Sequence, residues 1–344
     1  MDIITLLRWR STCNEAYAHA SATLKRSLTM LVNPFLTRPA TLLQIIDRFN
    51  AVIGGELAFA YICRDKHHIP NTLEIFTSAF HFEPLCYAIL TSPDTSPDIM
   101  HTSISIPRHP FSIEHDIVEC VQLHLKSGRT LYIQRSSTIS ALSPISRSIC
   151  TALMNFVTPR GFGCAYPRLT LNDKSLLSDH RQSSMNDLDL YLMSVLSENR
   201  LDFAVDPAVW PCYQMWSSVP PFVGSATPCW RSHFICPDQG RYFGDHGSMV
   251  EYFDPLTSMT VSQEILPIPY SVNVIWRLSS TFRCSFHCAS HDTNLPNALT
   301  SITIRMVKNA SLRLRNNQPS DRKRPFISNM TTQTRYSLHR RPTI

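Results

Sequence analysis

The chain has 344 residues, of which 43% are hydrophobic, and its formal net charge is +6. This much apolar material is enough for one large domain or two modest ones, and it excludes a chain that is disordered throughout. Residues 305–344 hold ten Lys and Arg against one acid, Asp321, so the other 304 residues carry a net charge of −3. Charge therefore gives no reason to expect a nucleic-acid surface on the body of the protein.

Two helices are predicted at the start of the chain, over residues 14–31 and 39–49. The first has Ser11 or Thr12 as its cap, and the second has apolar residues at helical spacing with a proline in its first turn. Residues 1–38 are therefore expected to form a helical extension in front of the first domain.

A strand, turn, helix and second strand follow in quick succession. Residues 51–53 predict a short strand, Gly54-Gly55 predicts a tight turn, residues 56–63 predict a helix, and residues 72–77 predict another strand. Short connections between alternating elements are typical of an α/β unit.

The run FNAVIGGELAFAYICRDKHHIPNTLEIF resembles the opening of the polymerase-beta-type nucleotidyltransferase fold, and Gly54, Gly55 and Glu74 carry the likeness. The resemblance implies a nucleotide site at Gly54, Gly55 and Thr72. Small residues at a helix N-terminus let backbone N–H groups approach a triphosphate, which the positive end of the helix dipole favours.

The acids that such an enzyme uses to hold magnesium are largely missing. The family has two alternating acids on the second strand, which point the same way and grip an ion pair. Here Thr72 stands at the first position and only Glu74 remains. The neighbouring strand, TLYIQ, offers Thr130, Tyr132 and Gln134 but no third carboxylate. Since magnesium needs several hard oxygen ligands, we expect a catalytically inactive protein that binds a nucleotide or a protein partner, or acts as a scaffold.

Two other interpretations stay open at this point. In one, Gly54-Gly55 is only a backbone turn and Glu74 is a solvated strand acid. In the other, the protein is an active magnesium-dependent transferase in which Glu74 is the catalytic residue. Glu74 would then be joined by a second acid from residues 94–98 or from Glu114, Asp116 or Glu119.

Residues 117–135 predict a β-hairpin that turns at Ser127-Gly128. A buried helix is expected over residues 144–157, and an amphipathic helix over 186–197. Asp187 and Asp189 imitate a two-acid signature, but residues two apart on a helix diverge by ~200° and cannot share one ion.

A second likeness covers residues 40–300. The segments ALMNFVTPRGFGCAYPRLTL and RYFGDHGSMVEYFDP resemble uncharacterised proteins abundant in mushroom-forming fungi, which share a nucleotidyltransferase-like front half. The resemblance implies an α+β fold, with a mixed sheet and flanking helices over residues 39–205. It implies no activity.

Residues 206–300 are rich in Pro, Trp and Tyr and predict irregular structure packed on that domain, with strands only at 249–253 and 272–278. Two Cys/His groups in this region have the chemistry of a tetrahedral zinc site, although their spacing matches no standard finger. The residues are Cys229, His233, Cys236, Cys284, His287 and Cys288. The alternative is that they are ordinary buried thiols and surface histidines.

The end of the chain, residues 301–344, is expected to be disordered because it has few large apolar side chains and no periodicity. Its Arg322-Lys323-Arg324 cluster has the charge to contact nucleic-acid phosphates or an import receptor, and a merely solvated tail is the alternative. The eleven cysteines are scattered and are expected to be buried, reduced thiols. With no signal peptide and no membrane-spanning run, we expect a cytoplasmic or nuclear protein that has no membrane partner.

Overall fold

The computed structural model describes residues 1–64, 70–105, 116–178, 187–198, 201–214, 230–254 and 274–279. The chain divides into two units, Met1–Thr303 and Ile304–Ile344, and every described residue lies in the first. The predicted disordered tail over residues 301–344 lies outside the described residues.

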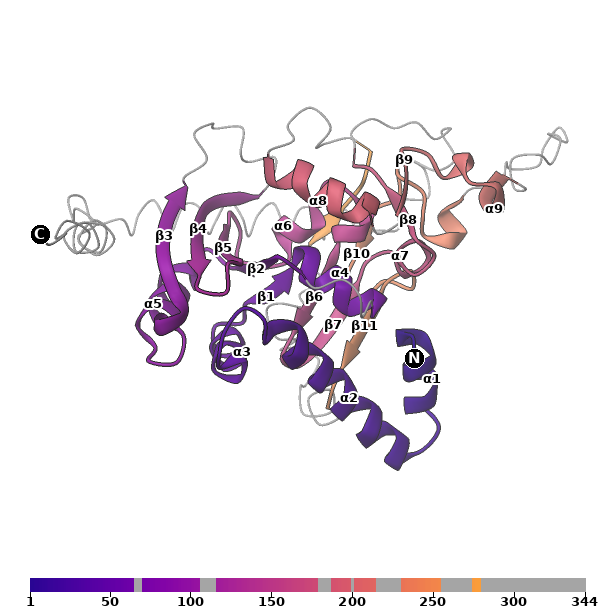
Figure 1. Cartoon of the computed structure of the whole chain (residues 1–344). Helices are drawn as coiled ribbons and strands as arrows, with labels where there is room; N and C mark the ends of the chain where they lie inside the picture. The colour runs from indigo at the N-terminus through magenta and orange to yellow at the C-terminus, as the bar shows by residue number, and fades with distance from the viewer. Residues whose placement is uncertain are drawn as a thin grey trace, which may run out of the picture. The chain divides into compact units, whose positions relative to one another are not determined.

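An eight-stranded mixed sheet forms the centre of the first unit, in the order β11-β7-β6-β1-β2-β5-β4-β3 (Figure 1). The neighbours in this sheet are antiparallel except β2 and β5, which are parallel. The strands are β1 Val52–Gly54, β2 Thr72–Thr77, β3 Ile99–Ser105, β4 Ile117–Leu125, β5 Thr130–Ser136, β6 Asn155–Thr158, β7 Gly161–Cys164 and β11 Met249–Tyr252. Two small sheets pair β8 Lys174–Leu176 with β9 Asp202–Ala204, and β10 Arg241–Tyr242 with β12 Ile275–Trp276.

Helices flank this sheet. They are α1 Ile3–Arg10, α2 Asn14–Val32, α3 Pro39–Arg48, α4 Gly55–Cys63, α5 Phe82–Thr91, α6 Ser143–Ser146, α7 Pro167–Thr170, α8 Asp187–Glu198 and α9 Pro211–Gln214. Short 3-10 turns add Ser96–Asp98, Thr151–Leu153, Pro207–Val209 and Trp230–His233. The predicted α+β class, with a large mixed sheet and flanking helices, is therefore confirmed.

One face of the sheet is largely apolar and packs against the N-terminal helices. Leu73, Ile75, Leu131 and Ile133 point to this face and share one buried cluster with all but the first residue of the apolar stripe of α2. That stripe repeats every four residues, through Ala16, Ala20, Leu24, Leu28 and Val32, which is the spacing of one helix face. In Figure 1, α1, α2, α3 and α5 lie on this side of the sheet and α6 and α8 lie on the other.

The opposite face is divided between two kinds of side chain. On β1, β6 and β7 it is apolar, where Val52 and Phe156 join a second cluster with Tyr166 and Trp276. On β5, β4 and β3 the same face carries Thr130, Tyr132, Gln134, Gln122, His124 and His101, with Thr72 and Glu74 beside them on β2. We call these eight residues the polar sheet face.

The helices and the strand predicted for the N-terminal part of the chain are confirmed. The strand predicted over residues 72–77 has the same bounds as β2, and the predicted helices over 14–31 and 39–49 match α2 and α3 within one residue. The cap of α2 differs, because the Cys13 sulfur accepts the backbone N–H of Ala16 in place of Ser11 or Thr12.

The buried helix predicted over residues 144–157 is wrong. Only α6 is helical at its start, and the segment ends in strand β6, which pairs with β1 and β7. Short apolar runs fit a buried strand as well as a buried helix, so periodicity alone does not separate the two. The hairpin over 117–135, the helix over 186–197 and the strand at 249–253 are confirmed as β4–β5, α8 and β11.

None of the helices among the described residues combines the length and the apolar character that crossing a membrane would require.

Candidate functional site

The Gly54-Gly55 turn brings the chain from β1 into α4 at the middle of the sheet. Gly55 has φ +60°, the left-handed region that glycine adopts without strain. A Cβ on Gly54 would lie 2.6 Å from the Phe76 ring, and a Cβ on Gly55 would lie 1.8 Å from Oε1 of Glu74. Both positions therefore need glycine because β2 packs directly against the turn.

Glu74 lies at the centre of this arrangement. In the strand register it is opposite Gly54 on β1 and Tyr132 on β5. Only 4% of the residue is exposed, and its Oε2 accepts a hydrogen bond from Nε2 of Gln134 at 2.9 Å. The structure thus brings Glu74, Gln134 and Gly55 together, and the interpretation of Glu74 as a solvated strand acid is wrong.

A second buried carboxylate, Glu56, was not singled out from the sequence. It is 1% exposed in the first turn of α4. Its Oε2 accepts the backbone N–H groups of Asn71 and Thr72 and the Thr72 hydroxyl, each at 3.0 Å. The signal in the sequence was a lone acid opening an otherwise apolar helix, since a charge placed there must find donors.

Thr72 is bonded to this carboxylate. Its hydroxyl and its backbone N–H both donate to Glu56, so the side chain joins the start of β2 to the start of α4. The two carboxylates, Glu56 and Glu74, both lie at the N-terminal end of α4, where the helix dipole favours negative charge.

The other acids proposed as partners of Glu74 are bonded elsewhere. Asp94 accepts from Thr41, Asp98 from Thr37, and Asp116 from Ser143. Arg147 and Arg135 form ion pairs with Asp116 and Glu119. Glu114 lies outside the described residues.

Glu119 is also on the wrong side of the sheet. It is in register with Arg135, whereas Glu74 is in register with Tyr132, and odd and even positions of β5 point to opposite faces. Across the described residues, moreover, no group of three or more His, Cys, Asp or Glu side chains is placed to hold a metal ion.

The polar sheet face continues from Glu74 towards β3 as a row of paired polar side chains. Gln122 Nε2 donates to the Tyr132 hydroxyl at 3.4 Å. His101 and His124 stack across β3 and β4, with ring centroids 5.9 Å apart. Partial burial raises the pKa of Tyr132, with Cys120 and Glu74 adding to the rise, so this hydroxyl stays protonated at neutral pH.

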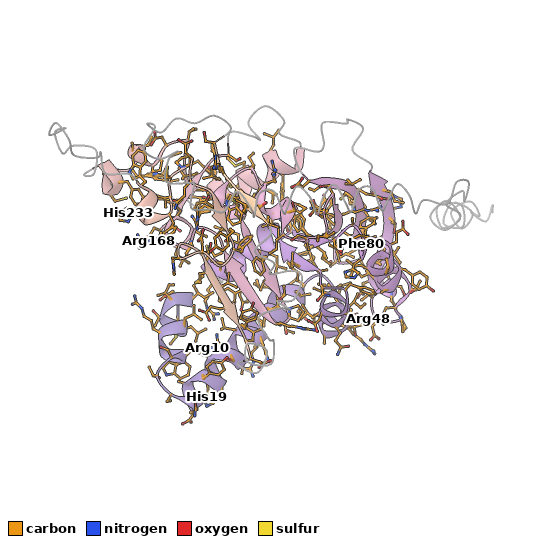
Figure 2. All side chains as sticks on the ribbon, turned by 180° about the vertical axis from the view of Figure 1, so that it is seen from behind. Arg10, His19, Arg48, Phe80, Arg168 and His233 are labelled. Atoms are coloured by element: carbon orange, nitrogen blue, oxygen red, sulfur yellow. The ribbon has the colours of Figure 1, made fainter. Side chains whose placement is uncertain are left out.

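Most of the predicted zinc ligands lie outside the described residues, namely Cys229, Cys284, His287 and Cys288. Of the other two, Cys236 is buried, and His233 Nδ1 lies 2.7 Å from Nη1 of Arg168 (Figure 2). The zinc site stays a prediction.

No two of the cysteines that the structure describes are joined to each other by a disulfide. Cys86, Cys150, Cys164 and Cys236 are buried, but Cys13 and Cys212 are exposed, so the expectation of burial is wrong for these last two.

The glycine-containing segment 240–248 is organised around a side chain that the sequence analysis also missed. Arg241 is fully buried and its guanidinium donates to both carboxylate oxygens of Asp245, at 2.5 and 3.0 Å. It also donates to the Ala165 carbonyl at 2.7 Å and stacks over the Tyr166 ring. This bidentate ion pair fixes the loop that leads into β11, which gives the segment a structural role.

No protein-family model matches this chain, and comparisons with curated proteins and with solved structures found no match either.

Proposed function

We propose that this chain is a catalytically inactive nucleotidyltransferase-like protein that acts as a binding or scaffolding module, similar in kind to the mushroom-type proteins it resembles. The observation that supports this best is the use of Glu74. Its carboxylate accepts a hydrogen bond from Gln134 and packs on Gly55, so the side chain holds β2, β5 and the start of α4 together.

The surrounding electrostatics favour the same conclusion. A triphosphate that approached the N-terminus of α4 would meet the carboxylates of Glu56 and Glu74, both buried. Without a bound cation, like charges at such a distance repel strongly in a medium of low polarity. The described residues provide too few carboxylates to gather the cations that would offset this repulsion.

The test uses the full chain and its Glu74→Gln variant, which keeps the shape of the side chain and removes its charge. Calorimetric titration with ATP, GTP, CTP and UTP in the presence of Mg²⁺ should give weak or undetectable binding for both proteins. Labelled nucleotide should not be incorporated into any acceptor.

A result that contradicts the proposal can be defined in advance. Sub-micromolar binding together with incorporation of label, both lost in Glu74→Gln, would show that Glu74 is catalytic and would overturn the proposal. Matched unfolding curves of the two proteins at neutral pH serve as the control that Glu74→Gln remains folded.

A further inference from the structure

The sheet has two edges, and they differ in what covers them among the described residues. At one edge is β11, and at the other is β3, which bonds only to β4 among the described residues (Figure 1). The outer side of an edge strand presents a row of N–H and C=O groups that can pair with another chain.

The β11 edge is closed by the N-terminal helices. Arg10, at the end of α1, is buried and donates to the backbone carbonyls of Tyr252 and Phe253 (Figure 2). Lys25 of α2 forms an ion pair with Asp254 at 2.8 Å. Covering an edge with a helix and placing charges beside it are two of the ways in which proteins prevent strands from pairing edge to edge.

The β3 edge carries none of the charged or proline residues that protect many natural edge strands, and one irregularity in its register is the protective feature that it does have. Its sequence, IMHTSIS, contains no Lys, Arg, Asp, Glu or Pro. One irregularity in register lies between Ile99 and His101, so the strand is regular from His101 to Ser105. Two apolar side chains on this strand are exposed, Met100 at 66% and Ile104 at 38%.

The sequence of β3 is also complementary to itself. If two copies pair antiparallel about Thr102, the backbone is regular at the centre of the contact, and Met100, at the register irregularity, comes next to Ile104 of the partner subunit. Each His101 then lies opposite Ser103 of the partner subunit. Apolar neighbours across two strands stabilise a sheet, and a strand without Lys, Arg, Asp or Glu places none of these charges against its own kind.

We propose that β3 pairs with β3 of a second copy of this chain, antiparallel and centred on Thr102, so that the two sheets become one. A two-fold contact requires a surface that matches itself, and this uncharged strand meets that requirement. A basic or acidic peptide would find no opposite charge on β3 to hold it.

The dimer should depend on concentration, because a single strand pair buries less than the ~1,200 Å² of a stable interface. Sedimentation of the full chain at concentrations up to ~100 µM is expected to show a dimer in equilibrium with the monomer. Ile104→Lys should shift this equilibrium to the monomer, since two lysines would then lie in the contact. Met30→Lys is the matched control, because Met30 is 67% exposed on α2, away from β3, and this variant should still dimerise.

The register has its own test. Directly opposed residues in antiparallel strands have Cα atoms about 4.5–5.5 Å apart, which a disulfide can bridge. Thr102→Cys should therefore form a covalent dimer under mild oxidation. Met30→Cys measures the background from the native cysteines.

Three results would each overturn the proposal. They are a wild-type chain that stays monomeric, a dimer that Ile104→Lys leaves unchanged, and Thr102→Cys that cross-links no faster than Met30→Cys. If Ile104→Lys loses its native circular dichroism, Met100→Lys replaces it, since that side chain is already largely in solvent.

Discussion

The carboxylate of Glu74 lies against the backbone of Gly55, with its Oε1 only 1.8 Å from the point where a Cβ would stand. The glycine turn and the acid are therefore one structural unit, formed between residues nineteen positions apart in the sequence. Neither residue can change size without moving the other, and this relationship can be measured as a free energy of unfolding.

Gly55→Ala should destabilise the protein by more than its backbone conformation alone explains. A left-handed alanine costs about 1 kcal/mol, and forcing a methyl group into Glu74 adds about 1–3 kcal/mol. Gly128→Ala is the matched control, because Gly128 has φ +78° and open space around it. Urea unfolding should give the larger loss for Gly55→Ala, and adding Glu74→Ala should recover part of it. Equal losses at positions 55 and 128 would contradict the contact.

Gln134→Glu should make the stability of the fold depend on pH. The substitution places two carboxylates at the 2.9 Å separation that the hydrogen bond between Gln134 and Glu74 now spans. Burial and mutual repulsion raise the pKa values of such a pair, so the folded state binds protons that the unfolded state releases, and stability falls as the pH rises through the ordinary carboxyl range. We expect a loss of about 3 kcal/mol at pH 8 and a smaller loss at pH 5.

The control for this experiment is Gln134→Met, which removes the donor without adding a charge. Its loss should grow less steeply with pH than that of Gln134→Glu in the same urea titration, because only one buried carboxylate then remains without its donor. A Gln134→Glu variant as stable as the wild type at pH 8 would mean that the site is open to water.

The sequence predicted the parts of this site that depend on local pattern. The β2 strand and the Gly54-Gly55 turn carry strong signals, since alternation and paired glycines restrict the backbone over a few residues. Glu56 was missed because its donors, Asn71 and Thr72, come from a different element, and no local pattern records such a contact.

The sequence did not predict strand β3, and it predicted a helix over residues 144–157 where strand β6 forms. The two errors have related causes. The β3 sequence is mostly polar, and it becomes a strand only because β4 supplies a partner. In β6, Phe156 and Val157 point to opposite faces, and both are buried because the sheet is covered on both sides there. A strand buried on two sides loses the alternation that would identify it.

The exposed and the buried cysteines should differ strongly in their rates of alkylation. The backbone N–H of Ala16, at the start of α2, lowers the pKa of the exposed Cys13 thiol, so this thiolate should react first with iodoacetamide. Burial raises the pKa of Cys86 and of Cys164 to about 12, and both should react only after unfolding. Peptide mass spectrometry with and without urea distinguishes them. Rapid labelling of Cys164 in the native protein would mean that the apolar face of the sheet is accessible.

Glu251→Gln should stabilise the protein at neutral pH. Burial raises the pKa of Glu251 and outweighs the opposing effect of the Arg10 guanidinium, whose Nη1 lies 3.4 Å from Oε2 of Glu251. A raised pKa means that the folded state holds a proton more tightly than the unfolded state, so stability is lost as the pH rises above the ordinary carboxyl value. Glutamine has no proton to lose, and Arg10 keeps its bonds to the backbone carbonyls of Tyr252 and Phe253.

The melting temperature of Glu251→Gln should therefore exceed that of the wild type at pH 8, and the two should converge near pH 4. Asp254→Asn provides the comparison, because it breaks the more exposed ion pair with Lys25 and should change stability little. Melting temperatures of the wild type, Glu251→Gln and Asp254→Asn, measured between pH 4 and 8, test this prediction. A lower melting temperature for Glu251→Gln at pH 8 would show that attraction to Arg10 exceeds the cost of burying the carboxylate, and that Glu251 helps to close the β11 edge.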